Sequence, residues 1–307
     1  MTDRVGKSKW ILACVFVMGL VIVQSASAET GILLLAHGGS AEWNGRVTNL
    51  VAQVNATRPA EVAFGMATRA NIQNAVDKLV ARGVTEIVAV PLFVSSWSTV
   101  ITSTEYLLGL RPEAPAALAN YAKMNHAPGG TATAGHDNHV AAIDGTTPIN
   151  SPVPVRMTAA LNDHQTVVDI LASRARAISR DPSKEALIIV AHGPNEEEDN
   201  RRWLADMGSV ATRIKNTETF ASLEYLTLRD DAPKAVRDAA TMQLRGIVER
   251  ELTVGRRVLI VPLLIAFGGI ERGLRERLEG LAYTMAEAAL MPDDRLAAWV
   301  VAMAERR

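Results

Sequence analysis

Two histidines stand at the same place in two similar apolar segments of the chain. Ile32–Ser40 reads ILLLAHGGS and Leu187–Asn195 reads LIIVAHGPN, so His37 and His192 each follow an aliphatic run and precede a glycine. Near neutral pH an unperturbed imidazole is largely unprotonated, so it can ligate a divalent cation or accept a proton. A histidine hydrogen-bonded to the backbone at a strand-to-helix turn is the alternative for either one. The recurrence favours a catalytic or metal-binding role for at least one of them.

The two segments belong to a longer internal duplication. Three further pairs of segments align in the same order: Gly65–Val76 with Tyr225–Val236, Glu86–Trp97 with Arg257–Gly268, and Met157–Leu161 with Ala286–Leu290. The first of these alignments pairs Arg69 with Arg229. Because there are two long copies and not many short ones, the pattern indicates a duplicated domain and not a solenoid.

Each copy alternates between strand-like and helix-like patterns. Short apolar runs suited to strands buried on both faces occur at Ile32–Ala36, Val62–Phe64, Ile87–Leu92 and Val153–Met157. Helical spacing of apolar residues follows in both copies, at Ile72, Ala75, Val76, Leu79 and Val80 and at Val236, Ala239, Ala240, Ile247 and Val248. Alternating strands and helices predict an α/β fold with two lobes, each a parallel sheet flanked by helices, at residues 29–181 and 182–307.

The first 28 residues have the pattern of a secretory signal peptide. Basic residues open the chain, the uncharged run Trp10–Val23 follows, and small residues stand at Ala26–Ala28. We therefore expect a periplasmic or secreted protein, with a transient N-terminal membrane anchor as the alternative because the apolar run is shorter than the roughly 20 residues of a membrane span. The only cysteine, Cys14, lies in this segment, so a mature chain would have no disulfide and no thiolate ligand.

Composition and motifs exclude several classes of function. The formal net charge is -1, with basic and acidic residues interspersed, so we expect no nucleic-acid partner. The sequence contains no G-x-S-x-G elbow, phosphate-binding glycine loop or dinucleotide fingerprint. A hydrolase or transferase is therefore disfavoured, and no nucleotide cofactor is expected.

The first copy carries an insertion at 121–154 that is rich in Gly, Ala, Thr, Asn and Pro and lacks periodicity. It holds three of the six histidines, His126, His136 and His139. We expect a loop that folds over the crevice and brings some of these imidazoles to His37 as metal ligands. A solvated polar loop is the alternative.

Two other polar features have simpler interpretations. The acidic run Glu196–Asp199 is expected to form the first turn of a helix, where the helix dipole favours negative charge. His164, at the start of another helical pattern, has Asp293 as its counterpart in the second copy, which indicates a capping role.

The combination of segments resembles a known family. LLLAHGGS followed by a helix, then EVAF, then EIVAVPLFVSSW, is similar to the CbiX/SirB group of class II tetrapyrrole chelatases, the sirohydrochlorin cobalto- and ferrochelatases. The second copy resembles it too, so the chain is similar to the long, two-lobed form of that family. The resemblance implies two chelatase-like lobes that insert Co²⁺ or Fe²⁺, with Ni²⁺ as a further option, into a tetrapyrrole such as a cobalamin precursor.

The resemblance also implies roles for particular residues, with three departures from the family pattern. The family's strand-end histidine falls on His37, with His192 as its copy, and Arg69 and Arg229 would bind the carboxylates of the macrocycle. Either arginine could instead hold its own loop. A second family histidine would fall near Thr99 and Ile270, and a family glutamate falls on Met66, so these metal-handling groups are missing.

Two functions therefore remain open at this stage. One is a chelatase acting on sirohydrochlorin or a related tetrapyrrole, with metal held by the histidines named above. The other is a non-catalytic periplasmic protein that binds metal or tetrapyrrole. The order of motifs along the chain favours the first, and the signal peptide and missing ligands favour the second.

Overall fold

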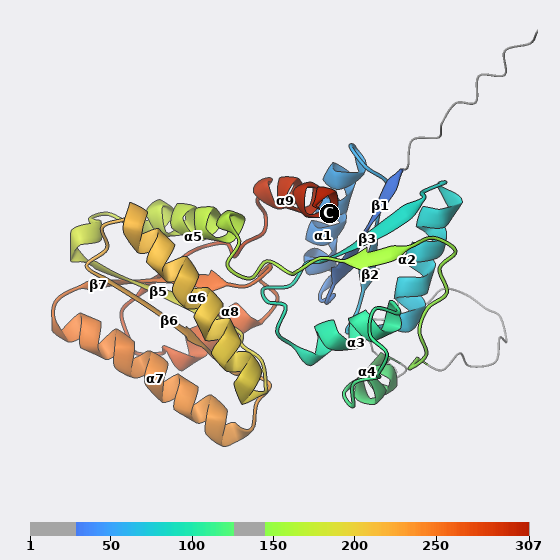
Figure 1. Cartoon of the computed structure of the whole chain (residues 1–307). Coiled ribbons are helices and arrows are strands. Elements are labelled where there is room, and N and C mark those ends of the chain that lie inside the picture. Colours follow the sequence, from blue (N-terminus) through green and yellow to red (C-terminus); the bar gives the residue numbers. More distant parts are fainter. Residues whose placement is uncertain (1–28, 126–144, 307) are drawn as a thin grey trace, which may run out of the picture.

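The strands form two separate four-stranded parallel sheets within residues 29–125 and 145–306, which the computed structural model describes (Figure 1). The first sheet has the order β2 (Ala60–Phe64), β1 (Thr30–Ala36), β3 (Glu86–Pro91) and β4 (Val155–Met157). The second has the order β6 (Ser222–Thr227), β5 (Glu185–Ala191), β7 (Arg257–Leu263) and β8 (Thr284–Met285). The identical order confirms the predicted duplication and the α/β fold.

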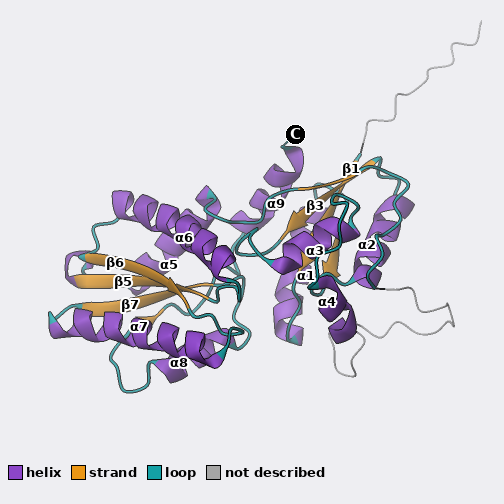
Figure 2. Ribbon diagram, turned by 60° about the horizontal axis from the view of Figure 1, so that its bottom comes forward, coloured by secondary structure: helices purple, strands orange, loops and turns teal. Residues whose placement is uncertain are grey.

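Helices connect the strands and cover both faces of each sheet (Figure 2). Those in the first half of the chain are α1 (Ala41–Asn55), α2 (Arg69–Ala81), α3 (Thr99–Leu107), α4 (Leu118–Asn125) and α5 (Gln165–Ile178). After the short 3₁₀ helix η1 (Pro182–Lys184) come α6 (Glu197–Thr217), α7 (Lys234–Thr253), α8 (Ile270–Arg277) and α9 (Arg295–Glu305). No helix in the described ranges is long and apolar enough to cross a membrane.

Successive residues of each strand face opposite layers, which explains the continuous aliphatic runs. In β1, Ile32 and Leu34 pack with α1 and α9, whereas Leu33 and Leu35 pack with α2, α3 and α4. In β5, Ile189 packs with α5 and α6, whereas Ile188 packs with α7 and α8. Both faces of each central strand are therefore dry.

The last helix of each half packs on the sheet of the other half. Helix α5 contacts β7 and α6, and α9 contacts α1 and β3 (Figure 1). The expected division at residue 181 follows chain order, but the packing does not: α5 lies with the second sheet and α9 with the first. The chain therefore crosses twice between the lobes.

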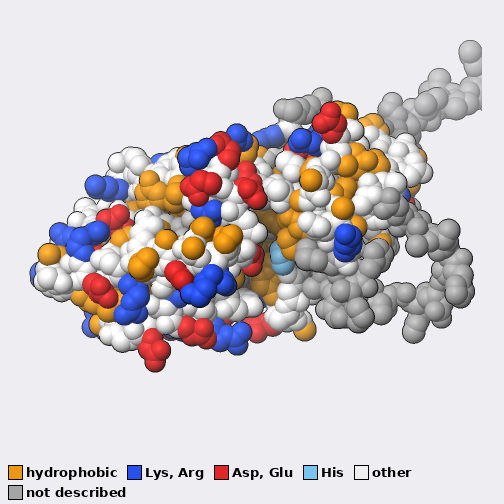
Figure 3. Space-filling view, turned by 90° about the horizontal axis from the view of Figure 1, so that it is seen from below, with side chains coloured by type: hydrophobic (Ala, Val, Ile, Leu, Met, Phe, Trp, Pro, Cys, Tyr) orange, Lys and Arg blue, Asp and Glu red, His pale blue; other side chains and the backbone are white. Residues whose placement is uncertain are grey.

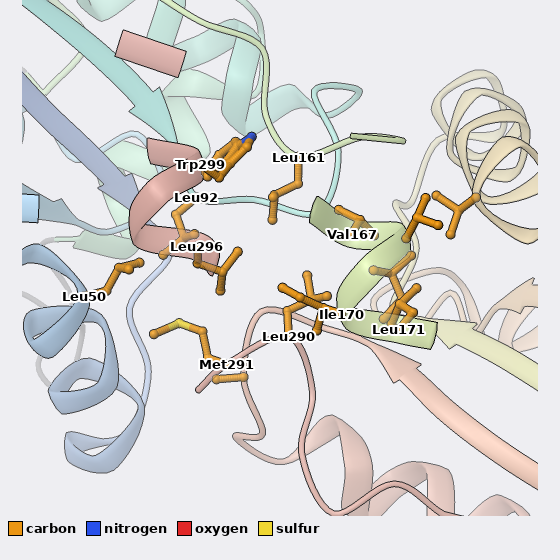
Figure 4. Packing of buried hydrophobic residues seen from close by; sticks show 14 of the residues in the cluster. Leu50, Leu92, Leu161, Val167, Ile170, Leu171, Leu290, Met291, Leu296 and Trp299 are labelled. Atoms are coloured by element: carbon orange, nitrogen blue, oxygen red, sulfur yellow. The ribbon is translucent and has the colours of Figure 1, made fainter. Parts of the chain in front are cut away.

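One hydrophobic cluster runs through both lobes because of this exchange. Figure 4 shows Leu92 and Leu296 on the first-lobe side, Leu290 and Met291 in the centre, and Ile170 on the second-lobe side. The two crossing segments leave their lobes by equivalent hydrogen bonds, from Leu161 N to Phe93 O (3.2 Å) and from Leu290 N to Leu264 O (3.0 Å). The predicted equivalence of Leu161 and Leu290 is thus confirmed.

The strand register corrects one predicted pairing. Gly65 N donates to Ala36 O, and Leu228 N donates to Ala191 O. Since Ala36 and Ala191 are equivalent, Gly65 matches Leu228 and the next residues, Met66 and Arg229, match each other. Arg229 is therefore the counterpart of Met66 and not of Arg69. The residues that follow β2 and β6 lie in loops without periodicity, so the sequence alone could not fix how these two loops align.

The insertion is only partly a loop. Its first residues belong to α4, where the Tyr121 side chain is buried against the first sheet. Residues 1–28, including the expected signal peptide and Cys14, and residues 126–144, including His126, His136 and His139, lie outside the described residues.

Candidate metal-handling cleft

His37 follows β1 at the carboxyl edge of the first sheet. Its ring Nδ1 lies 2.6 Å from Gly38 O, so Nδ1 carries the proton that is donated and Nε2 is left with its lone pair. Gly38 has a φ of +83°, a left-handed conformation that glycine adopts without strain. The His37 side chain is exposed and is available to a ligand.

His192 repeats this arrangement and adds a partner. Its Nδ1 lies 2.7 Å from Gly193 O, and its Nε2 lies 3.3 Å from Oδ2 of Asp231. Gly193 has a φ of +79°, and an added Cβ would lie 2.6 Å from the Thr227 Cβ, so only glycine fits this turn. The His192 side chain is 29% exposed, so one edge of the ring still faces solvent.

The electrostatics join the two histidines to one carboxylate. Burial lowers the pKa of His192, but the hydrogen bonds that the ring donates to the Asp231 carboxylate and the Gly193 carbonyl outweigh it, and the pKa is raised. The hydrogen bond with His192 lowers the pKa of Asp231, burial opposes this, and the charges of His192 and His37 lower it further. Because His37 also acts on Asp231, both rings border the same space between the lobes. Figure 3 shows a furrow there with a histidine side chain visible in it.

Asp230 and Asp231 are functional candidates that the sequence analysis missed. Asp230 Oδ1 accepts a hydrogen bond from Arg277 at 2.5 Å, while its Oδ2 is buried with no partner. Its charge also raises the pKa of His192. The signal was present in the sequence, because two carboxylates three and four residues after the end of β6 lie at the same edge of the parallel sheet as its strand-end histidine.

The family positions that the sequence lacks are occupied by other groups. Thr99 and Ile270 are the first residues of α3 and α8, which confirms that they are equivalent. The Thr99 hydroxyl is 2.6 Å from the Tyr121 hydroxyl, so it is already engaged. Met66 packs against the apolar core beneath α2. None of these three side chains offers a strong ligand for a hard or borderline divalent metal.

Both arginines expected to bind carboxylates donate hydrogen bonds to backbone carbonyls of other loops. Arg69 donates to Thr147 O (2.9 Å) and Pro148 O (3.1 Å). Arg229 is buried, and it donates to Pro194 O and Asn195 O (2.6 Å each) and to Glu197 (2.8 Å). This arrangement is the alternative in which each arginine fixes a loop. In the second lobe that loop directly follows His192.

Two simpler predictions are confirmed. Helix α6 begins at Glu197, with the acidic residues in its first turn. His164 caps α5: its Nδ1 accepts a hydrogen bond from Thr166 N at 3.2 Å.

The described residues contain no group of three or more His, Cys, Asp or Glu side chains placed to hold one metal ion. The cleft therefore offers His192 with Asp231 on one side and His37 across from them, without a closed coordination sphere. The three insertion histidines stay untested as ligands.

The resemblance seen in the sequence is confirmed by comparison with known families and structures. Residues 31–178, from β1 to the end of α5, match the family model CbiX. No curated protein sequence matches the chain.

Two solved structures share the fold. One is SirB from Bacillus subtilis, solved with Fe³⁺, with a TM-score of 0.59 and 13% identity over 90% of this chain and 94% of that one. The other is DR2241 from Deinococcus radiodurans, a multi-domain protein described as structurally similar to chelatases, with a TM-score of 0.51 and 18% identity. That match covers 91% of this chain and 55% of DR2241. The chain therefore has a chelatase-like fold that matches SirB, built from two duplicated lobes.

Proposed function

We propose that the protein is a class II chelatase that inserts a divalent metal ion into a tetrapyrrole bound in the cleft. The observation that carries the proposal is the pair of equivalent strand-end histidines that border one cleft and act on one carboxylate, Asp231. The family match of the first lobe supports the reaction class. The metal, Co²⁺, Fe²⁺ or Ni²⁺, is a substrate of this reaction.

The chemistry follows from what insertion requires. A hydrated ion must lose water, and two pyrrole N–H groups must lose their protons as the metal binds the four ring nitrogens. Once Nε2 of His192 has lost its proton, that nitrogen and the Asp231 carboxylate, 3.3 Å apart, can bind one face of an incoming ion. His37, on the other side of the cleft, can accept a pyrrole proton at its unprotonated Nε2.

A proton competes with the metal at His192. Since Asp231 raises the pKa of His192, more of the ring is protonated at a given pH than in an ordinary histidine. Metal capture is therefore expected to strengthen as pH rises through this pKa and to release a proton. Asp231 compensates by keeping the ring oriented and by adding negative charge toward the cation.

A non-catalytic metal- or tetrapyrrole-binding protein is the second candidate. It is favoured by the absence, among the described residues, of a three-ligand metal group, and by the threonine, isoleucine and methionine at family positions. From the first 28 residues we also propose that the protein is exported to the periplasm or secreted. This location also favours a binding protein. Sequencing the N-terminus of the protein recovered from the periplasm tests the export step.

One experiment separates the two functions. Purified protein is mixed with sirohydrochlorin and, in separate samples, Co²⁺, Fe²⁺ or Ni²⁺, and the absorption change is followed. Saturable acceleration over the uncatalysed reaction supports the chelatase, and stoichiometric binding without turnover supports the binding protein. If neither turnover nor binding is observed with any of the three metals, both functions are contradicted.

Matched variants locate the site. His192→Ala is expected to reduce the rate, or the metal affinity, by about 10- to 100-fold, as for other groups that hold and orient a metal. His164→Asn is the control, because asparagine also caps helices and His164 lies on α5 outside the candidate site. Equal loss in both variants would mean that the effect is structural.

A further inference from the structure

Arg277, the last residue of α8, holds the loop at residues 228–231 that carries the two candidate carboxylates. Its Nη1 donates to Leu228 O at 3.1 Å, and its Nη2 donates to Asp230 Oδ1 at 2.5 Å. The Arg277 and Asp230 side chains are only 16% and 19% exposed, so this ion pair is largely shielded from solvent. One guanidinium therefore fixes both the backbone at the start of the loop and the carboxylate next to Asp231.

The backbone of this loop needs such anchors. Arg229 has a φ of +55°, a left-handed conformation that is sterically unfavourable for a residue with a Cβ. A conformation of this kind persists only where surrounding contacts hold it in place. Arg229 N donates to His192 O at 2.7 Å, which ties the strained residue to the strand-end histidine. Arg277 then binds the residues directly before and after it, Leu228 and Asp230.

The equivalent loop of the first lobe provides an internal comparison. The loop register places Ala67 and Thr68 where the second lobe has its two aspartates. The equivalent first residues of α3 and α8 place Tyr106 where the second lobe has Arg277, and Tyr106 packs against the apolar core. Among the described residues, the guanidinium and the two carboxylates thus occur together, in one lobe and not in the other.

We propose that Arg277 is a positioning residue for metal capture: by holding Leu228 O and Asp230, it keeps the Asp231 carboxylate beside Nε2 of His192. The inference deepens the proposed function and rests on it for the metal, whereas the effect of Arg277 on the loop needs no metal.

The shape of the guanidinium matters as well as its charge. A carbonyl oxygen and a carboxylate oxygen are bound at once by two nitrogens of one planar group. A lysine ammonium keeps the charge but does not reproduce this fork, so Arg277→Lys is not a conservative change here. This difference separates a positioning role from a purely electrostatic one.

Amide hydrogen exchange of the full chain, followed by NMR without metal, tests the positioning. The Leu228 and Arg229 amides, which bond to the backbone at the end of β5, report how firmly the loop is docked. Arg277→Met should speed their exchange about tenfold, because local opening becomes easier once two hydrogen bonds to the loop are lost. Arg277→Lys should speed it by a similar factor. Arg275→Met, the same charge change at an exposed position of α8, should leave exchange unaltered.

Calorimetric titration with Co²⁺ alone connects the loop to the metal. Arg277→Met is expected to weaken Co²⁺ binding about 10-fold, as for other groups that orient a metal ligand. Because Arg277 acts through Asp231, adding Arg277→Met to Asp231→Asn should cause no further loss. A purely electrostatic role predicts the opposite sign, since removing a positive charge near the site strengthens the binding of a cation. Arg275→Met should bind Co²⁺ like the unmutated chain.

Four results would overturn the proposal: unaltered exchange in Arg277→Met, unaltered exchange and Co²⁺ affinity in Arg277→Lys, tighter Co²⁺ binding by Arg277→Met, or losses that multiply in the double variant. Circular dichroism confirms that each variant is folded, and Arg277→Gln provides a second uncharged variant should the methionine not fold. Absence of Co²⁺ binding by the unmutated chain would contradict the proposed metal site itself, and the exchange result would then decide whether Arg277 positions the loop.

Discussion

The two lobes present the same histidine in different surroundings. His37 and His192 share the strand end, the left-handed glycine and the bond from Nδ1 to the next carbonyl. Among the described residues, a carboxylate lies at Nε2 of His192 and none is paired with Nε2 of His37. Duplication has kept what the backbone determines, the position of the ring, while the loops that supply its partner have diverged.

The same contrast appears where the loop that follows the third strand of each lobe contacts the other lobe. In the loop between β7 and α8 of the second lobe, an added Cβ on Gly268 would lie 3.2 Å from the Trp43 side chain of the first lobe, so this contact is apolar and close. In the equivalent loop of the first lobe, Trp97 meets Arg202 and Asp206, whose buried Oδ2 has no partner among the described residues. At the second junction, burial raises the pKa of the Asp206 carboxyl to about 6.

The largest expected difference between the lobes is in their loop arginines. Arg229→Ala should lower the free energy of unfolding by about 3 kcal/mol, because a buried guanidinium and its partners lose three hydrogen bonds. Arg69→Ala, whose two bonds are exposed, should cost less than about 1 kcal/mol. Urea denaturation measures both.

The same pair also tests the role implied by family resemblance. Weaker tetrapyrrole binding by Arg69→Ala, with unchanged metal binding, would show that Arg69 binds the macrocycle carboxylates. In that case the Arg69 guanidinium gives up its hydrogen bonds to the Thr147 and Pro148 carbonyls when the tetrapyrrole binds. Equal costs of unfolding in the two arginine variants would contradict the difference drawn between the loops.

A second difference lies at the opposite ends of the strands. Glu185 pairs with Arg257 across β5 and β7 at 2.6 Å, where the first lobe has Thr30 bonded to Glu86 at 2.6 Å. Arg257→Met should cost about 2 kcal/mol, less than for a fully buried pair, because Ser179 and Arg180 N still bond to Glu185. Glu86→Gln keeps an acceptor for Thr30 and should cost about 0.5 kcal/mol. Thermal unfolding of both variants gives the comparison.

The smallest effect is a change in titration. Asp231→Asn should lower the pKa of His192, since the carboxylate that favours the imidazolium is lost. The contribution of this pair to stability is present between the lowered pKa of Asp231 and the raised pKa of His192. It is lost below the first as the carboxylate is protonated and above the second as the imidazolium loses its proton. Histidine NMR resonances followed from pH 5 to 9 report the shift, with Asp238→Asn on α7 as the control. An unchanged His192 titration would remove the difference between the two rings.

The sequence predicted the features that depend on periodicity. Four such features lie where they were expected: the aliphatic runs at β1 and β5, the helical spacing in α2 and the acidic first turn of α6. Each depends on burial periodicity or helix electrostatics among residues that are close together in the sequence. The equivalence of the two histidines followed in the same way. The insertion was predicted less well, since Tyr121 belongs to a helix that only its packing on the first sheet reveals.

Tertiary structure decided how the halves combine and which groups surround the site. The exchange of α5 and α9 depends on which sheet each amphipathic helix covers, and both sheets offer a similar apolar face. The partners of His192, the loop bonds of Arg229 and the unsatisfied oxygen of Asp206 depend on side chains from separate segments meeting in space. Sequence alone determined that a histidine follows each central strand and lies at the carboxyl edge of its sheet, because parallel strands all end at that edge. The contacts across the cleft were determined only when the two lobes packed together.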